Sequence, residues 1–195
     1  GASKSRARIS LREANRVPSP GTIAKLGLRH QRKACLLLVF AFSNSADATS
    51  FTSATDLSNA VDEWCNDASG TESSYGEIST WDTSRVTDFA QLFYDCGDAG
   101  FGGDVSSWDT SSVTTMYQTL RYAMNFNNDI SQWDTSQVTT MESMFYMALA
   151  FNGDIQQWDT SSVTTMQNMF QGDPMWGSAF NGNIAQWDTS QVTTM

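Results

Sequence analysis

Carboxylate side chains recur at regular intervals along most of this chain, and they are the groups that could do chemistry. One column follows the tryptophan of each Trp-Asp-Thr-Ser motif and comprises Asp82, Asp109, Asp134, Asp159 and Asp188. A second column precedes the motif and comprises Asp104, Asp129 and Asp154, with Asn183 at the equivalent place in the last unit. Acid–base catalysis needs two carboxylates in different environments. Repeated positions share one environment, so we expect a non-enzymatic protein, with a secreted hydrolase that uses these carboxylates as the alternative.

The same columns are candidate cation ligands. Stacked repeat units place equivalent residues about 5 Å apart, where like charges repel. For the aspartates of the motif, we expect the N–H groups of a following helix to offset this repulsion. Asp104, Asp129 and Asp154 have no such helix behind them. Calcium, which takes about six to eight oxygen ligands, is the candidate cofactor for that column.

Histidine and cysteine restrict the remaining chemistry. The single histidine is His30, and the chain beyond residue 48 has none. Catalysis of the Ser-His-Asp or Cys-His kind and most zinc sites are therefore excluded there. Cys65 and Cys96 lie in that part of the chain. Export to an oxidising compartment would permit one disulfide between them; two buried thiols are the alternative, because the sequence does not give their separation.

Residues 1–48 are organised like a leader with a secretory signal peptide. Residues 1–33 hold nine Lys or Arg and one acid, an apolar run of nine residues follows at 34–42, and Ala46 and Ala48 supply a small-residue cleavage site. We therefore predict a secreted or cell-surface protein. A basic, Ser-rich leader is also typical of an organelle transit peptide, so organelle targeting is the alternative. The apolar run is far short of the roughly 20 residues that span a bilayer, so no transmembrane segment is expected in this fragment.

The rest of the chain is strongly acidic. Residues 49–195 hold two arginines, Arg85 and Arg121, against nineteen acids, which gives a net charge of −17. Such a surface repels nucleic acid. The basic leader has no aromatic residue among its charges, which a nucleic-acid module usually has. We therefore expect no nucleic-acid partner.

An internal repeat of about 25 residues organises this acidic part. Trp-Asp-Thr-Ser begins at positions 81, 108, 133, 158 and 187, at spacings of 27, 25, 25 and 29. The extra residues fall at one place in the unit, near 96–98 and 172–174, which indicates surface loops on one edge of a stack.

Within a unit, the apolar positions have a helical period. They are Val138, Met141, Met144, Phe145 and Ala148. We therefore expect a short helix there and a short strand at residues 154–158. The alternative places the strand at the Ser-x-Val-Thr-Thr segment, whose β-branched residues favour a sheet.

These elements must be stacked, because one unit cannot bury its apolar face alone. We predict an α/β solenoid with one short strand and one short helix per coil, and a core of Trp, Val, Met, Phe and Ile columns. Residues 55–64 predict an amphipathic helix, with Thr55 as its N-cap, that covers the N-terminal end of the stack. The predicted organisation is a leader and signal peptide at 1–48, a cap and half repeat at 49–80, and a repeat array at 81–195 that is truncated at its C-terminus.

Residues 151–166, Phe-Asn-Gly-Asp-Ile-Gln-Gln-Trp-Asp-Thr-Ser-Ser-Val-Thr-Thr-Met, followed by Met169 and Phe170, resemble the BspA-type leucine-rich repeat. This is the mycoplasma-type surface-lipoprotein repeat, a domain of unknown function, and the resemblance covers about residues 51–195. Departures are Asn183 in place of Asp and Thr119-Leu120 in place of Met-Phe. Cys35 lies inside the apolar run, so a lipid anchor is not indicated.

The resemblance implies right-handed leucine-rich-repeat-like coils and an extracellular or surface location. It also implies adhesion, through binding of an extracellular protein or glycan, with no catalytic residues. A passive structural component of a wall or stalk is the alternative function, because repeat architecture by itself does not specify a ligand.

Overall fold

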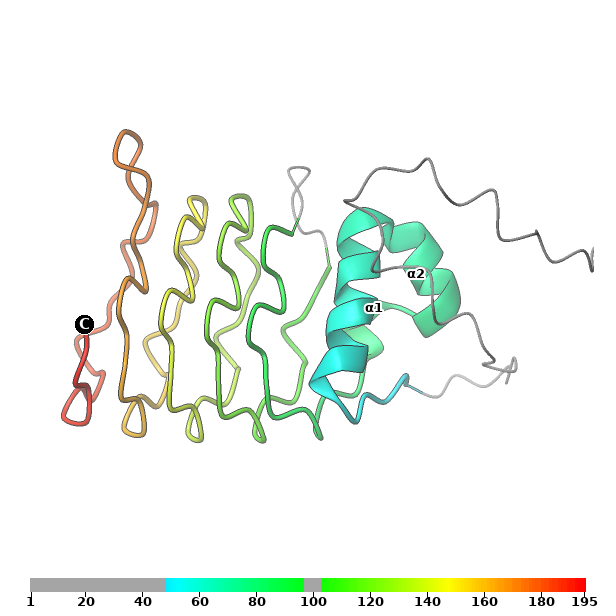
Figure 1. The fold of residues 1–195 in the computed structure, drawn as a ribbon, viewed down its shortest axis with the longest axis horizontal. Coiled ribbons are helices and arrows are strands. Elements are labelled where there is room, and N and C mark those ends of the chain that lie inside the picture. The colour runs from blue at the N-terminus through cyan, green and yellow to red at the C-terminus, as the bar shows by residue number, and fades with distance from the viewer. Residues whose placement is uncertain (1–47, 97–102) are drawn as a thin grey trace, which may run out of the picture. The chain divides into compact units, whose positions relative to one another are not determined.

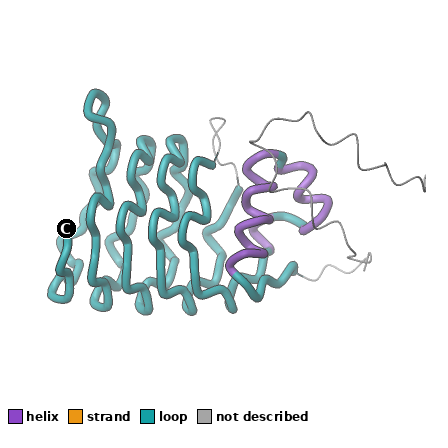
Figure 2. The backbone as a smooth tube through the Cα atoms, in the orientation of Figure 1, coloured by secondary structure: helices purple, strands orange, loops and turns teal. Residues whose placement is uncertain are grey.

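The computed structural model describes residues 48–96 and 103–195 (Figure 1). The predicted leader and signal peptide, and the insertion predicted near residue 97, lie outside these residues. The described chain begins with α1 at Ala54–Asn66, α2 at Ala68–Tyr75 and a 3-10 turn, η1, at Ile78–Thr80. Turn-rich coils follow and lie side by side from the helices to the C-terminal end (Figure 2).

The first helix confirms the prediction of an amphipathic helix. Leu57, Val61 and Trp64 are buried on one face of α1. The N-cap prediction was wrong. The side chain of Ser53, not Thr55, accepts the N–H of Asp56 at 3.1 Å, because the helix begins one residue before Thr55.

The second helix has no signal in the apolar pattern. Its residues are mostly small and polar, and Thr71 is its only buried residue. Asp67 joins the two helices. Its N–H donates to the Glu63 carbonyl at the end of α1, and its carboxylate accepts the N–H of Gly70 at 3.1 Å at the start of α2.

The first helix lies next to the first coil, and α2 packs on the other side of α1 (Figure 1). The ring of Trp64 in α1 packs edge-on against Trp81, with 6.1 Å between the ring centroids. The N–H of Phe51, just before α1, donates to the carbonyl of Asp82 at 2.9 Å. The start of the described chain is therefore bonded to the first Trp-Asp-Thr-Ser motif.

The predicted α/β solenoid is wrong. Within residues 48–96 and 103–195, the coils contain no strand, and no helix follows η1. The segment expected to be helical, 138–148, consists of turns around one bridging residue, Thr140, and the segment 154–158 expected to be a strand is a turn.

The backbone hydrogen bonds explain why no helix forms. In one coil, alternate N–H groups donate to the next coil, from Met141 to Thr165, Ser143 to Gln167, Phe145 to Met169 and Met147 to Gln171, at 2.8–3.0 Å. Between them, Met144 and Tyr146 donate to the carbonyl three positions back, at 3.2 and 3.1 Å, and Glu142 donates to the Thr140 hydroxyl oxygen at 3.3 Å. An α-helix instead needs every N–H for its own i−4 carbonyl.

Left-handed residues accompany this alternation. Ser143 has φ of 53° and Met147 has φ of 60°, and the equivalent residues of other coils share the conformation. Such residues interrupt a right-handed helix. The coil therefore keeps the apolar spacing of a helix while its backbone folds as successive tight turns.

The alternative strand position comes closer to the observed pairing. Isolated parallel bridges run from coil to coil through Asp88, Thr115, Thr140, Thr165 and Thr194. All but the first lie in the Val-Thr-Thr segment. The pairing is one residue long in each coil, so it forms a ladder between coils but no strand.

The predicted core columns are confirmed. Buried members of these columns include Trp81, Trp108, Trp133 and Trp158; Val86, Val113, Val138 and Val163; Met116, Met141 and Met166; Phe126 and Phe151; and Val105, Ile130 and Ile155. Each large apolar side chain contributes roughly 2 kcal/mol on burial. The columns are continuous from coil to coil, so the stack has one shared core.

Candidate functional site

The Trp-Asp-Thr-Ser motif bonds each coil to the coils on both sides. In the central coil, Nε1 of Trp133 donates to the Val105 carbonyl of the preceding coil at 3.0 Å. Oγ1 of Thr135 donates to the Asp159 carbonyl of the following coil at 2.9 Å. Trp133 and Thr135 are 3% and 1% exposed, so both donors are paired where water does not reach. These two residues of the motif are structural.

The aspartate of the motif caps a turn in its own coil. Asp82, Asp109, Asp134, Asp159 and Asp188 each accept, through Oδ1, the N–H of the serine two residues on, at 2.8–3.1 Å. The prediction that these aspartates cap helices was wrong, because a turn and not a helix follows. The backbone N–H partner that the prediction required is nevertheless present.

The second column of aspartates does the same. Oδ1 of Asp104 accepts the Ser106 N–H, Oδ1 of Asp129 accepts the Ser131 N–H, and Oδ1 of Asp154 accepts the Gln156 N–H, at 2.9–3.0 Å. Oδ1 of Asn183 accepts the Ala185 N–H at 3.0 Å. An amide oxygen therefore replaces the carboxylate in the last coil without loss of the bond.

These hydrogen bonds stabilise the charged carboxylates. The Ser111 hydroxyl, followed by the Ser111 N–H, lowers the pKa of Asp109 below its ordinary value, although the neighbouring Asp82 carboxylate acts in the opposite direction. Ser161 lowers the pKa of Asp159 in the same way. At Asp109 and Asp159, hydrogen bonding within the turn therefore outweighs the repulsion from the equivalent carboxylate of a neighbouring coil.

Stability should decrease in acid as a result. A carboxylate whose pKa is depressed in the folded state contributes stability above its unfolded pKa and loses it as the pH falls through the folded pKa. We expect the urea midpoint to hold near neutral pH and to fall below about pH 4, by a modest amount because these carboxylates are exposed. Unfolding at constant ionic strength checks this. The Asp159→Asn variant should lose its share of the pH dependence, and a midpoint that rises in acid would contradict the expectation.

The candidate calcium ligands instead accept hydrogen bonds within the turns of their own coils. Asp104, Asp129 and Asp154 each bind a backbone N–H of their own coil. Within the described ranges 48–96 and 103–195, no three His, Cys, Asp or Glu side chains come together in a way that could hold a metal ion.

Calcium should accordingly leave the stability unchanged. We expect the same Tm for the whole chain in millimolar calcium and in a chelator at matched ionic strength, because the part of the chain that the structure describes assembles no ligand cage of the kind calcium needs. Differential scanning calorimetry measures this directly. A rise in Tm that the chelator reverses and that Asp129→Asn abolishes would establish the calcium site instead.

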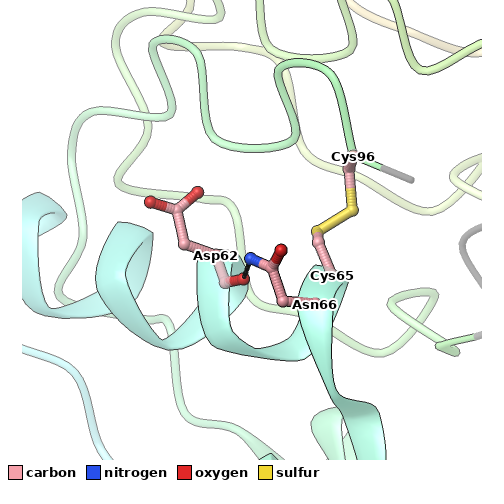
Figure 3. Close-up of a disulfide and its surroundings, with 4 residues drawn as sticks. All are labelled: Asp62, Cys65, Asn66 and Cys96. Carbon is pink, nitrogen blue, oxygen red and sulfur yellow. Dashed lines mark hydrogen bonds between the residues drawn. A yellow bond between two sulfur atoms is a disulfide. The ribbon is translucent and has the colours of Figure 1, made fainter. Parts of the chain in front are cut away.

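Cys65 and Cys96 form a disulfide (Figure 3). Their Cα atoms are 5.3 Å apart, and 31 positions separate them in the sequence. Cys65 lies near the end of α1 and Cys96 in the first coil, where it is buried. Of the two alternatives that the sequence leaves open, the structure has the disulfide, which ties the helices to the stack.

A row of tyrosines with one arginine lies along one edge of the coils. The rings of Tyr94, Tyr122 and Tyr146 meet nearly perpendicularly, with successive centroids 5.6 Å apart. The Arg121 guanidinium lies 5.1 Å from the Tyr122 ring centroid and 4.6 Å from that of Tyr146. The repeat holds a signal for this row that was missed, since Tyr94, Arg121 and Tyr146 each directly follow a large apolar core residue.

Coils that share one core and bond only to their neighbours define a tandem-repeat protein. Among the described residues, no helix is both long and apolar enough to cross a membrane. The sequence model of the family described as "Mycoplasma protein of unknown function, DUF285" matches residues 59–176 and, a second time, residues 157–195. The chain belongs to this family. No curated protein and no solved structure matches it.

Proposed function

We propose that this protein is a secreted or cell-surface scaffold that binds an extracellular protein or glycan and catalyses no reaction. Its coils are a divergent form of the BspA-type surface repeat. Membership in the mycoplasma-type family supports the relationship. Stacked repeats give a regular surface on which an extended partner can bind.

One observation carries the proposal. The repeated polar groups that could do chemistry are engaged within the fold, each in the same way in every coil, whereas large apolar side chains are exposed on coil edges. Asp109 and Asp159 accept hydrogen bonds from equivalent serines and have their pKa values lowered alike. Trp176 and Met175 are 78% and 80% exposed. Equivalent carboxylates suit a scaffold better than a hydrolase, and exposed aromatic residues suit binding.

Export is the second part of the proposal. The disulfide supports an oxidising destination, because such bonds are rare in proteins kept in a reducing cytosol. Residues 1–48 would then be the leader that directs secretion, with cleavage after Ala48 or Ala46. N-terminal sequencing of the protein recovered from the medium or the cell surface tests this, and an uncleaved chain or one recovered inside an organelle would overturn it.

Binding is tested with the whole protein on a glycan array and on a panel of purified extracellular-matrix proteins. The scaffold proposal requires at least one ligand that binds saturably and is not bound by an unrelated acidic repeat protein. If no ligand binds and the protein is found cross-linked within a wall or stalk, the passive structural alternative replaces it.

A further inference from the structure

The insertion predicted near residue 172 forms a closed loop at the tip of its coil. The N–H of Met147 donates to the Gln171 carbonyl at 2.8 Å, and the N–H of Ala179 donates to the Leu149 carbonyl at 3.0 Å. The equivalent bonds of the preceding coil run from Tyr122 to Tyr146 and from Ala150 to Met124, so residues 172–178 stand where that coil has residues 147–149, four residues fewer. In Figure 1 this loop, drawn in orange, rises beyond the tips of the coils beside it.

Hydrogen bonds hold the loop in one conformation. Asp173 and Gly177 exchange two backbone hydrogen bonds, of 3.0 and 2.7 Å. Oδ1 of Asp173 also accepts the N–H groups of Met175 and Trp176, at 2.7 and 3.1 Å. A Cβ on Gly172 would collide with the backbone of Gly177, so the close approach requires glycine. A loop ordered before binding loses little conformational entropy when a partner binds.

The loop carries the two most exposed large apolar side chains among the residues described before the final Met195, which are Met175 at 80% and Trp176 at 78%. Both side chains are therefore largely uncovered by the residues that the structure describes. Trp, Tyr, Met and Arg are the residues over-represented at the centres of protein interfaces. A preformed turn that presents Met and Trp outward therefore has the composition of a binding anchor.

Other residues of the same kinds lie along the same edge. The N–H of Ala150 donates to the Met124 carbonyl at 3.0 Å, which places Met124 at the equivalent tip of an earlier coil. Met124 is 40% exposed, and Tyr94, at the start of the tyrosine row, is 42% exposed. We call this surface the aromatic edge; it comprises Tyr94, Arg121, Tyr122, Met124, Tyr146, Met175 and Trp176.

Charge distinguishes among the partners that an apolar edge could take. Residues 49–195 carry a net charge of −17, from two arginines and nineteen acids. This field repels anionic lipid surfaces and acidic polymers, and attracts basic ones. A glycan site needs several polar groups that converge on the sugar. The carboxylate of Asp173 beside Trp176 is instead used inside the loop.

We propose that the aromatic edge binds an extended polypeptide segment that carries apolar side chains together with lysine or arginine. The segment packs its apolar side chains on Trp176, Met175 and the tyrosine row, and its cations lie near the acidic coils. This inference rests on the proposed scaffold function and specifies its partner.

Selection of a phage-displayed library of random peptides on the whole disulfide-bonded protein tests the inference. We expect enriched peptides to combine Lys or Arg with aromatic or aliphatic residues. For a synthetic peptide from that set, Trp176→Ala should weaken binding at least about tenfold, and Met175→Ala should also weaken it. Raising the salt concentration should weaken binding further. Ile184→Ala, an exposed apolar residue of the last coil, is the matched control and should leave binding unchanged.

Met175 and Trp176 lie in an exposed loop, so their alanine variants should fold, and an unchanged Tm verifies this for them and for Ile184→Ala. The proposal is overturned if no peptide is enriched, or if the selected peptide binds Trp176→Ala as tightly as the parent. It is also overturned if Trp176→Ala instead abolishes binding to phosphatidylserine vesicles or to a glycan array. If a matrix or glycan ligand binds Trp176→Ala as well as the parent, the aromatic edge is not the binding site, but the proposed scaffold function is still supported.

Discussion

Replacing Phe145 with alanine should lower the free energy of unfolding by about 3–5 kcal/mol. Phe145 is 2% exposed, and its ring stacks on Phe151 at 4.1 Å and on Phe170 at 5.3 Å between centroids. Its ring also lies 6.1 Å from that of Trp158. Alanine would leave a cavity between rings of two coils, which cannot close without moving both, and cavities add to the lost transfer energy.

Chemical denaturation of the Phe145→Ala variant measures this effect. Phe145→Leu refills part of the cavity and should cost clearly less. Met124→Ala, at an exposed tip, should cost under about 0.5 kcal/mol. A lower slope against denaturant would indicate that coils on the two sides of residue 145 unfold separately. A loss below about 1 kcal/mol for Phe145→Ala would contradict the burial of this ring between coils.

Removing the disulfide should cost about 3–4 kcal/mol. Cys65 and Cys96 are 31 positions apart, and the entropy of closing a loop of that size in the unfolded chain gives this magnitude. The bond joins α1 to the first coil, so reduction should also expose the N-terminal end of the core. The denaturation midpoint with and without a reductant gives the difference.

The double variant Cys65→Ala with Cys96→Ala is the control for this experiment. It should be about as unstable as the reduced protein and should not respond to the reductant. Alanine is preferred to serine because Cys96 is 4% exposed and a hydroxyl there would need a partner. A wild-type midpoint that ignores the reductant, with thiol titration showing complete reduction, would contradict the stabilising role of the bond.

The apolar pattern predicts the core of this protein and misassigns its backbone, for a physical reason. Met141, Met144, Phe145 and Ala148 have the spacing of a helical face, and all four are buried. That spacing reports which side chains share a face. It does not report where each N–H donates, and in the coils alternate N–H groups bind the neighbouring coil. Such bonds join residues about 25 positions apart, so a local pattern cannot contain them.

The sequence also does not indicate which residues adopt the left-handed backbone conformation. Ser143 and Met147 have positive φ, yet neither is the glycine or asparagine that usually marks such a position. The helix α1 is the contrasting case. Its signals are local, with a capping serine before a run of apolar residues at helical spacing, and they predict it correctly.

For the candidate site as well, the sequence shows some features and not others. The aspartate columns are visible in the sequence, but their partners are backbone N–H groups of turns that only the folded chain reveals. The sequence does not decide whether Cys65 and Cys96 form a disulfide, because their spacing along the chain does not give the distance between them in the fold. Met175 and Trp176 are apolar residues within a predicted surface loop, and that combination is a signal that sequence reasoning could have used.

Because the Trp-Asp-Thr-Ser motif makes the same hydrogen bonds in successive coils, the fold can accommodate more or fewer coils. The tryptophan of each motif donates backward to a carbonyl, and the threonines of the first four motifs donate forward to the next coil, so these coils offer their neighbours the same acceptors. Excision of residues 133–157 would present the Val105 carbonyl to Trp158 and the Asp159 carbonyl to Thr110, and both pairs would be restored. Duplication of a unit leaves no donor orphaned for the same reason. Genes that gain or lose whole units would therefore change the length of the stack while the hydrogen bonds between neighbouring coils are kept.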